Sequence, residues 1–239
     1  MKFTYSIPTK ILFGPGSFND LATTPLPGKK ALVVITAGKS MRANGYLDRL
    51  IDMLDKQGIG HALFDKILPN PVLRHVHEGA ALAREQGCDF VIGLGGGSSI
   101  DSAKSIAVMA KNPGDYWDYI SGGSGKGQPL VNGALPIVAI ATTAGTGTEA
   151  DPWTVITKED TNEKIGFGCA ETFPVLSVVD PEMMLTIPAH LTAYQGFDAL
   201  FHATEGYIAN VATPLSDAYA LKSIELLAKY LPAAVKDGS

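Results

Sequence analysis

The chain has 239 residues, of which 46% are hydrophobic and 18% charged, so it can build a sizeable core in one large domain or slightly more. The formal net charge of −5 argues against a protein that binds nucleic acid by neutralising phosphates. No apolar run resembles a signal peptide or a membrane span, and the two cysteines match no metal or redox spacing. We therefore expect a cytoplasmic protein with reduced thiols and no membrane partner.

The first half of the chain alternates short apolar runs with helical patterns. Because apolar strands alternate with helices, we predict an α/β fold with a doubly wound parallel sheet. The strands are predicted at 31–35, 61–65 and 88–96, and the helices at 45–58, within 69–87 after a turn, and at 100–111.

The second half changes character twice. Residues 112–135 are rich in Gly, Pro and Asn and predict a surface excursion. Strands then resume, with a Gly/Thr loop and a hairpin near 158–167, and from 189 onward the pattern is purely helical. We place a domain boundary so that 1–184 is an α/β domain and 185–239 holds the first helices of an all-helical domain, too few to bury a bundle core.

A glycine-rich loop follows the third predicted strand, in the sequence GLGGGSSID at 93–101. Its G-x-G-x-x-S pattern departs from a dinucleotide fingerprint at Ser98, where Gly or Ala is usual. The missing side chains at 95–97 let a pyrophosphate approach the backbone, and the positive end of the next helix favours it. The alternative is an ordinary helix start, capped by Ser98 or Ser99, with Asp101 in the first turn.

A second loop of small residues, ATTAGTGTEAD at 141–151, also follows a predicted strand. Ligands of open α/β sheets bind beyond the carboxyl ends of the strands, so the two loops can converge on one ligand. Thr142, Thr143 and Thr146 supply hydroxyl groups there. The alternative is an ordinary turn with local bonds between threonine and backbone.

The helical segment GFDALFHATEGY places Asp198 and His202 four residues apart, on one helical face. A carboxylate oxygen and an imidazole nitrogen at this spacing can chelate a divalent cation. The alternative is a solvated or capping polar pair without a metal.

The motifs together carry a resemblance. KILFGPGS, PNP, GLGGGSSIDSAK, TTAGTGTEA and DPEMMLTIPAHLTAYQGFDALFHATEGYI, in this order, closely resemble the iron-containing (group III) alcohol dehydrogenase family. The resemblance implies an NAD(P)-dependent oxidoreductase with a Rossmann-like cofactor domain at 1–184 and a helical metal domain, in the architecture of dehydroquinate synthase and glycerol dehydrogenase. It also implies a small alcohol or aldehyde substrate, a cofactor in the interdomain cleft, a metal that polarises the substrate oxygen, and a homodimer, formed through the N-terminal strands.

The resemblance also assigns site residues. It implies Asp198 and His202 as the first two metal ligands, for Fe²⁺ or alternatively Zn²⁺, and places Lys164 near the cofactor. These three are the catalytic residues that we expect. The remaining cofactor contacts that it implies are Asn70, Gly95, Gly96, Gly97, Ser98, Asp101, Thr142, Thr143, Thr146 and Met183.

The stretch VVITAGKSM decides between NAD and NADP. A carboxylate after the first central strand would bind the ribose 2′-hydroxyl and repel a 2′-phosphate. This position instead holds Gly38, Lys39 and Ser40. Lys39 can pair with a phosphate and Ser40 can donate to it, so we expect NADP, with NAD as the alternative.

The metal site departs from the family pattern. Members take two further histidine ligands from later helices, and no histidine follows His202 here. We therefore expect a chain that is C-terminally truncated relative to the family and lacks part of the metal site. Three hypotheses follow: a metal-dependent alcohol dehydrogenase or aldehyde reductase, a nucleotide-binding but catalytically inactive chain, and a relative of glycerol dehydrogenase or maleylacetate reductase.

Overall fold

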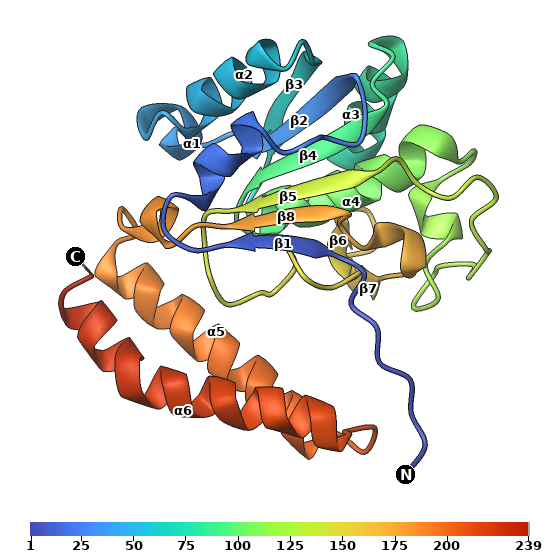
Figure 1. The fold of residues 1–239 in the computed structure, drawn as a ribbon. Coiled ribbons are helices and arrows are strands. Elements are labelled where there is room, and N and C mark those ends of the chain that lie inside the picture. The colour runs from blue at the N-terminus through green and yellow to red at the C-terminus, as the bar shows by residue number, and fades with distance from the viewer. Residues whose placement is uncertain (239) are drawn as a thin grey trace. The chain divides into compact units, whose positions relative to one another are not determined.

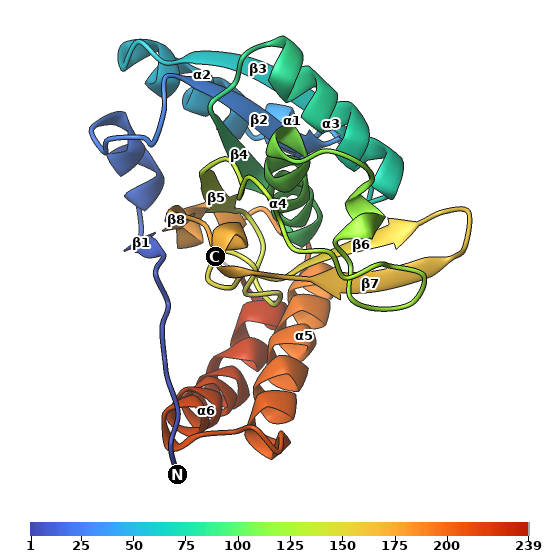
Figure 2. The ribbon, with the colours of Figure 1, turned by 90° about the vertical axis from the view of Figure 1, so that its right-hand side faces the viewer.

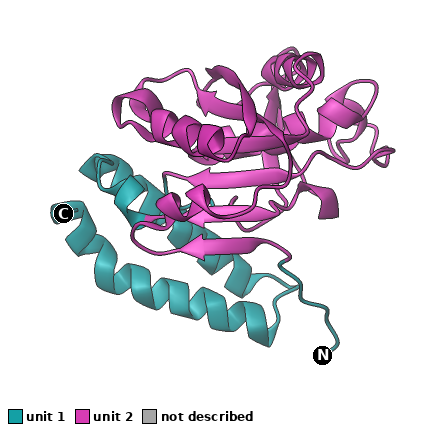
Figure 3. Cartoon of the chain, turned by 45° about the horizontal axis from the view of Figure 1, so that its top comes forward, with its two compact units in different colours: residues 1–7, 143–147, 181–239 teal, residues 8–142, 148–180 magenta. Residues whose placement is uncertain are grey.

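The computed structural model describes residues 1–238 and divides the chain into two compact units, distinguished by colour in Figure 3. One, here called the α/β unit, comprises residues 8–142 and 148–180. The other, here called the helical unit, comprises residues 1–7, 143–147 and 181–239. A functional division at 184/185 stays a prediction, and each unit is described by itself below.

A parallel six-stranded sheet forms the centre of the α/β unit, in the strand order β1-β8-β5-β4-β2-β3 (Figure 1). The predicted α/β fold with a parallel sheet is therefore confirmed. Central strands such as β2 are buried along nearly their whole length, because helices cover both faces and leave no strand position in water. The strands are β1 (Lys10–Phe13), β2 (Lys30–Thr36), β3 (Gly60–Ile67), β4 (Phe90–Gly95), β5 (Ile137–Ala141) and β8 (Leu176–Val179).

Helices flank the sheet on its two faces, as Figure 2 shows. Helices α3 and α4 pack against each other on one face, and α2 lies on the other beside the 3₁₀-helix Ser17–Ala22. This arrangement follows from right-handed crossovers, because the connection from β2 to β3 runs across the sheet in the opposite direction to those from β3 to β4 and from β4 to β5. The helices are α1 (Ser40–Ala43), α2 (Tyr46–Lys56), α3 (Leu73–Glu85) and α4 (Gly97–Lys111).

The predicted hairpin is present as a separate two-stranded antiparallel sheet, with β6 (Thr154–Lys158) paired to β7 (Glu163–Phe167). Further 3₁₀-helices lie at Tyr116–Asp118, Ala170–Thr172 and Pro181–Met184.

The prediction that residues 112–135 form a surface excursion is wrong for the sequence YWDYI within it. Tyr116, Trp117, Tyr119 and Ile120 are all buried, and the Tyr116 ring meets the Phe167 ring edge-on at 5.8 Å. The local density of Gly and Pro predicts a loop, but burial of large aromatic area outweighs that signal.

The helical unit contains two long helices, α5 (Ala189–Ile208) and α6 (Pro214–Lys236), which pack against each other. Thr213 begins α6 with a capping box, since its hydroxyl accepts from Ser216 N–H, and Pro214 fits the first helical position. Large apolar side chains of both helices stay exposed, among them Phe201 and Tyr219. Within residues 1–238, no helix is both long and apolar enough to cross a membrane.

Candidate functional site

The carboxyl edge of the sheet brings together most of the predicted cofactor residues of the α/β unit. From β2 the chain continues toward β3, and from β4 it continues toward β5 in the opposite direction, so the topological switch point lies between β2 and β4. In open α/β sheets, ligands bind in the crevice outside such a point. Gly38 and Lys39 follow β2 and Ser40 begins α1, whereas Gly96 follows β4 and Gly97 and Ser98 begin α4.

Two glycines of the fingerprint set how closely α4 approaches β4. A Cβ on Gly93 would lie 2.9 Å from Ile100 Cα, and a Cβ on Gly95 would lie 2.6 Å from Ser99 Oγ. Gly95 also has a φ of +143°, which side-chain-bearing residues rarely adopt. These positions require glycine for packing and backbone geometry, whether or not a ligand binds.

The start of α4 tests the second interpretation of the glycine loop, a helix start capped by serine. The N-cap is Gly96, in an extended conformation, and among the described residues no side chain caps the helix. The alternative, with Ser98 or Ser99 as the cap and Asp101 in the first turn, is therefore wrong. Ser99 N–H donates to the Gly96 carbonyl at 3.0 Å, whereas the first N–H groups of a helix have no intrahelical acceptor and lie at the positive end of the helix dipole, which suits an anion.

The second loop is tied to the first. Thr142, directly after β5, donates its N–H to the carbonyl of Gly95 at 3.0 Å. Thr142 is buried, whereas Thr146 is exposed and belongs with Thr143 to the segment 143–147 of the helical unit. The structure therefore places Thr142 beside the glycine loop.

Asp101 lies one turn into α4, with its carboxylate engaged by the protein. Its Oδ1 accepts from Thr148 Oγ1 at 2.7 Å, and its Oδ2 accepts from Val155 N–H at 2.9 Å. Burial raises the pKa of this carboxyl above its ordinary value, although both hydrogen bonds oppose that shift. A direct contact between Asp101 and a cofactor stays a prediction.

Asn70 and Lys164 are brought together from distant parts of the sequence. Asn70 follows β3 with a left-handed φ of 58°, which asparagine tolerates, and Lys164 lies on β7. Lys164 Nζ donates to Asn70 Oδ1 at 2.9 Å, and both side chains lie at the surface. Two residues that the family resemblance assigned to the cofactor are thus hydrogen-bonded partners.

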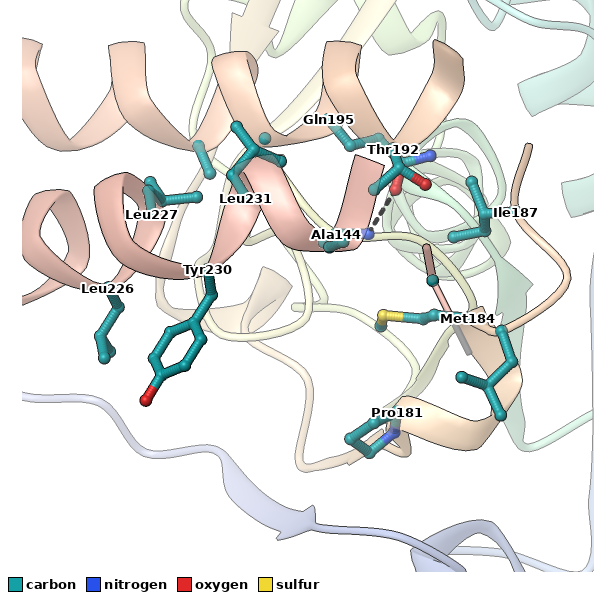
Figure 4. A pocket seen from close by; sticks show the side chains of 15 residues that line it. Ala144, Pro181, Met184, Ile187, Thr192, Gln195, Leu226, Leu227, Tyr230 and Leu231 are labelled. Carbon is teal, nitrogen blue, oxygen red and sulfur yellow. Dashed lines mark hydrogen bonds between the residues drawn. The ribbon is translucent and has the colours of Figure 1, made fainter. Parts of the chain in front are cut away.

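In the helical unit, Asp198 and His202 point along one face of α5. Asp198 Oδ1 lies 3.5 Å from His202 Nε2, and the two side chains are 45% and 59% exposed. Segment 143–147 packs close to this turn: a Cβ on Gly145 would lie 2.8 Å from Asp198 Oδ2. Ala144 N–H donates to Gln195 Oε1 at 2.9 Å, as the dashed line in Figure 4 marks.

The described residues offer few ligands for a metal ion. A carboxylate oxygen and an imidazole nitrogen are suitable ligands for Fe²⁺ or Zn²⁺. Within residues 1–238, however, no group of three or more His, Cys, Asp or Glu side chains could hold an ion. An open catalytic site uses about three protein ligands, so the described residues do not form a complete one.

An apolar cavity of about 370 Å³ also lies in the helical unit (Figure 4). Side chains of α5 and α6, including Gln195 and Leu231, line it together with the 3₁₀-helix Pro181–Met184. Met183 of that helix, a predicted cofactor contact, is almost completely buried. The lining is largely aliphatic, so the cavity offers shape and apolar surface, with few groups that could take part in chemistry.

Sequence reasoning missed Lys104, which is fully buried in α4. It is the one charged residue between Asp101 and Lys111, in a run of small and apolar residues. A single charged residue within an apolar helical run indicates a buried charge with hydrogen-bond partners, but the sequence does not show those partners, because they lie more than 40 residues away.

Comparison with known proteins agrees with the motif order. The profile of iron-containing alcohol dehydrogenases matches residues 8–181, and the profile of the C-terminal part of that family matches residues 192–239. Choline dehydrogenase of Bacillus subtilis is 40% identical over 237 residues, which are 98% of this chain and 58% of that protein. NAD-dependent methanol dehydrogenase of Bacillus methanolicus is 37% identical over 236 residues, 98% of this chain and 60% of that protein.

Solved structures show the same fold. An archaeal halo-thermophilic alcohol dehydrogenase from a Red Sea brine pool superposes with a TM-score of 0.94 at 36% identity, covering 100% of this chain and 61% of that one. The chain thus spans about three fifths of the length of the proteins it resembles.

Proposed function

The chain belongs to the iron-containing alcohol dehydrogenase family, and we propose that it binds a nicotinamide dinucleotide at the carboxyl edge of its parallel sheet. The observation that carries the proposal is the uncapped start of α4 at the switch point, with Thr142 hydrogen-bonded to Gly95 beside it. In this proposal the N–H groups of Gly96–Ser98 hold the pyrophosphate.

The other contacts extend along the dinucleotide. Asn70 and Lys164 act as one hydrogen-bonded pair, in which Lys164 brings a positive charge to the cofactor and Asn70 orients it. Thr142, Thr143, Thr146 and Met183 complete the set of proposed contacts.

We propose NADP as the preferred nucleotide. Residues 37–40 after β2 contain no carboxylate, and the exposed Lys39 precedes the short helix α1. An ammonium group there favours a 2′-phosphate over a 2′-hydroxyl. The methanol dehydrogenase relative is named NAD-dependent, and NAD is accordingly the alternative.

For the whole protein, we propose oxidation of a primary alcohol or reduction of the corresponding aldehyde. A bound nicotinamide would supply hydride-transfer chemistry at the substrate carbon, and the hydroxyl proton would exchange with solvent. Asp198 and His202 are the proposed metal donors, and a cation held there would supply Lewis acidity at the substrate oxygen. Because the described residues form only part of a donor set, we assign no catalytic step to a metal held by them alone.

The short donor set favours a second candidate, a chain that binds the nucleotide without turnover. An assay separates the two: NADPH oxidation is followed with short and medium aliphatic aldehydes, with and without anaerobic Fe²⁺. An enzyme shows iron-dependent turnover that is lost in Asp198→Ala and His202→Ala and kept in the control Glu225→Ala, an exposed carboxylate partnered by Lys222. A binding-only chain retains NADPH affinity in all variants and oxidises none of it.

We also propose a homodimer that forms through the edge strand β1. This strand ends the sheet order and exposes Ile11 and Phe13, so its free backbone groups can pair with a second copy. Light scattering should give twice the chain mass of 25.1 kDa, and Ile11→Lys should shift it to the monomer. A monomeric wild-type chain contradicts this part.

A further inference from the structure

A lysine with no exposed surface lies in the middle of α4. The three N–H groups of Lys104 Nζ are shared among four oxygens within hydrogen-bonding distance: Thr148 Oγ1 at 2.8 Å, the Asp151 carbonyl at 2.8 Å, Asp151 Oδ1 at 3.1 Å and the Trp153 carbonyl at 2.7 Å. All these acceptors lie in residues 148–153, which comprise the end of the second loop and the two residues that lead into β6. The lysine therefore fastens this segment to the helix that begins at the glycine loop.

Asp101 fastens the same segment from one turn earlier. The Thr148 hydroxyl accepts from Lys104 and donates to Asp101 Oδ1, so it is the central member of an ordered chain of three side chains. Asp101 Oδ2 also accepts from Val155 N–H on β6. The hydroxyl of Thr148 thus uses both its donor and its acceptor capacity on α4.

The hydrogen bonds of Lys104 and Asp101 to Thr148 fix one end of the second loop, and the hydrogen bond of Thr142 fixes the other end. Thr142 N–H is bonded to Gly95, at the end of β4, and Thr148 is bonded to α4, which begins two residues after Gly95. Both ends of the segment that carries Thr143 and Thr146 are therefore tied to the β4–α4 element. The glycine loop belongs to this same element.

Burial of an ammonium group is unfavourable unless its hydrogen bonds are satisfied, and an apolar side chain of similar volume often stabilises a core at least as well. Burial lowers the pKa of Lys104, while the carboxylates of Asp151 and Asp101 oppose the shift. Stability alone therefore gives a weak reason for a lysine here, whereas directional hydrogen bonds define the position of a loop.

We propose that Lys104, Asp101 and Thr148 are positioning residues that hold the second cofactor loop in the geometry required for nucleotide binding. This inference rests on the proposed dinucleotide site. In this role Asp101 acts through the hydroxyl of Thr148.

Thr148→Val is the decisive variant, because it keeps the side-chain shape and removes the hydrogen bonds of the hydroxyl with Lys104 and Asp101. Its matched control is Thr154→Val: Thr154 is equally buried and its hydroxyl also bonds α4, at the Asp101 carbonyl, but it lies on β6 outside the loop. Thr148→Ser keeps the hydroxyl and serves as the rescue variant. Each full chain is titrated with NADPH by fluorescence and melted by circular dichroism.

We expect Thr148→Val to raise the NADPH Kd by about five-fold or more, the usual scale for one net hydrogen bond. Thr148→Ser should bind like the wild type, and Thr154→Val should lower Tm without changing Kd. The inference is overturned when Thr148→Val binds normally, or when Thr154→Val weakens binding equally. A wild-type chain that does not bind NADPH overturns the proposed function itself, which distinguishes the two failures.

Discussion

Lys164 Nζ donates to Asn70 Oδ1 at 2.9 Å, although the two residues lie 94 positions apart in the chain. The hydrogen bond connects the hairpin strand β7 to the loop that follows β3. It fixes the direction of a surface lysine whose side chain would otherwise lose conformational entropy on binding a ligand.

The pair should therefore act as a unit toward the nucleotide. Lys164→Ala and Asn70→Ala should each weaken NADPH binding. The double variant should lose less binding free energy than the sum of the two single losses, with a coupling energy of about 0.5–1 kcal/mol. Isothermal titration of the four proteins measures this cycle. Lys66→Ala, which removes another exposed lysine paired with Glu78, is the charge-matched control. Additive losses would show that the hydrogen bond has no part in binding.

The start of α4 allows a test in which stability and binding change in opposite directions. Ser98→Asp places a carboxylate in the first turn of an uncapped helix, which should raise the free energy of unfolding by about 0.3–1 kcal/mol. The same charge repels a pyrophosphate, so the NADPH Kd should rise by at least about ten-fold. Urea denaturation and nucleotide titration measure the two effects, with Ser98→Ala as the neutral control. Unchanged affinity in Ser98→Asp would place the pyrophosphate elsewhere.

Lys39 tests the nucleotide preference. Removal of its charge by Lys39→Ala should weaken NADPH binding by about ten-fold, the scale of one charge-assisted hydrogen bond, and leave NADH binding unchanged. Lys56→Ala removes an equal charge at the end of α2 and should affect neither nucleotide. Equal losses for NADPH and NADH in Lys39→Ala would refute a role in reading the 2′-phosphate.

His75 predicts a pH dependence of stability. The ring is buried beside Phe64, and burial lowers its pKa below the ordinary value of 6.5. The unfolded chain therefore binds a proton at a higher pH than the folded chain, so the stability linked to His75 is present above pH 6.5 and is lost as the pH falls below it.

The variant His75→Phe replaces the imidazole with a ring that cannot be protonated, so it removes this contribution to the pH dependence of stability. Between pH 7.5 and 5.5, the wild type should lose more unfolding free energy than His75→Phe, by at most about 1.4 kcal/mol per pH unit. Burial raises the pKa values of Asp101 and Glu149, which gives the opposite trend in both proteins and cancels in the comparison. Parallel denaturation curves at both pH values would exclude His75 as the titrating group.

The sheet could be predicted because its determinants are local. Apolar strands such as 31–35 alternate with amphipathic helices, and the observed β2 and α2 lie within a few residues of the expected bounds. The start of α4 was predicted three residues too late, at Ile100, because serines usually cap helices and here Gly96 takes that position.

The features that the sequence did not predict depend on contacts between residues far apart in the chain. The composition around YWDYI predicts a surface loop, but its aromatic rings are buried against residues far away in the sequence. Lys104 finds its acceptors in 148–153, which no helical periodicity could reveal. The pairing of Lys164 with Asn70 likewise needs the fold, because the sequence gives no register between β7 and the loop after β3.

The central claim is that the carboxyl edge of the sheet, through the start of α4, holds a dinucleotide. Isothermal titration of the full chain with NADPH tests it most directly. The account predicts one saturable site per chain with micromolar Kd, weakened at least about ten-fold in Ser98→Asp. No saturable binding at millimolar NADPH, or full binding retained in Ser98→Asp, would contradict it.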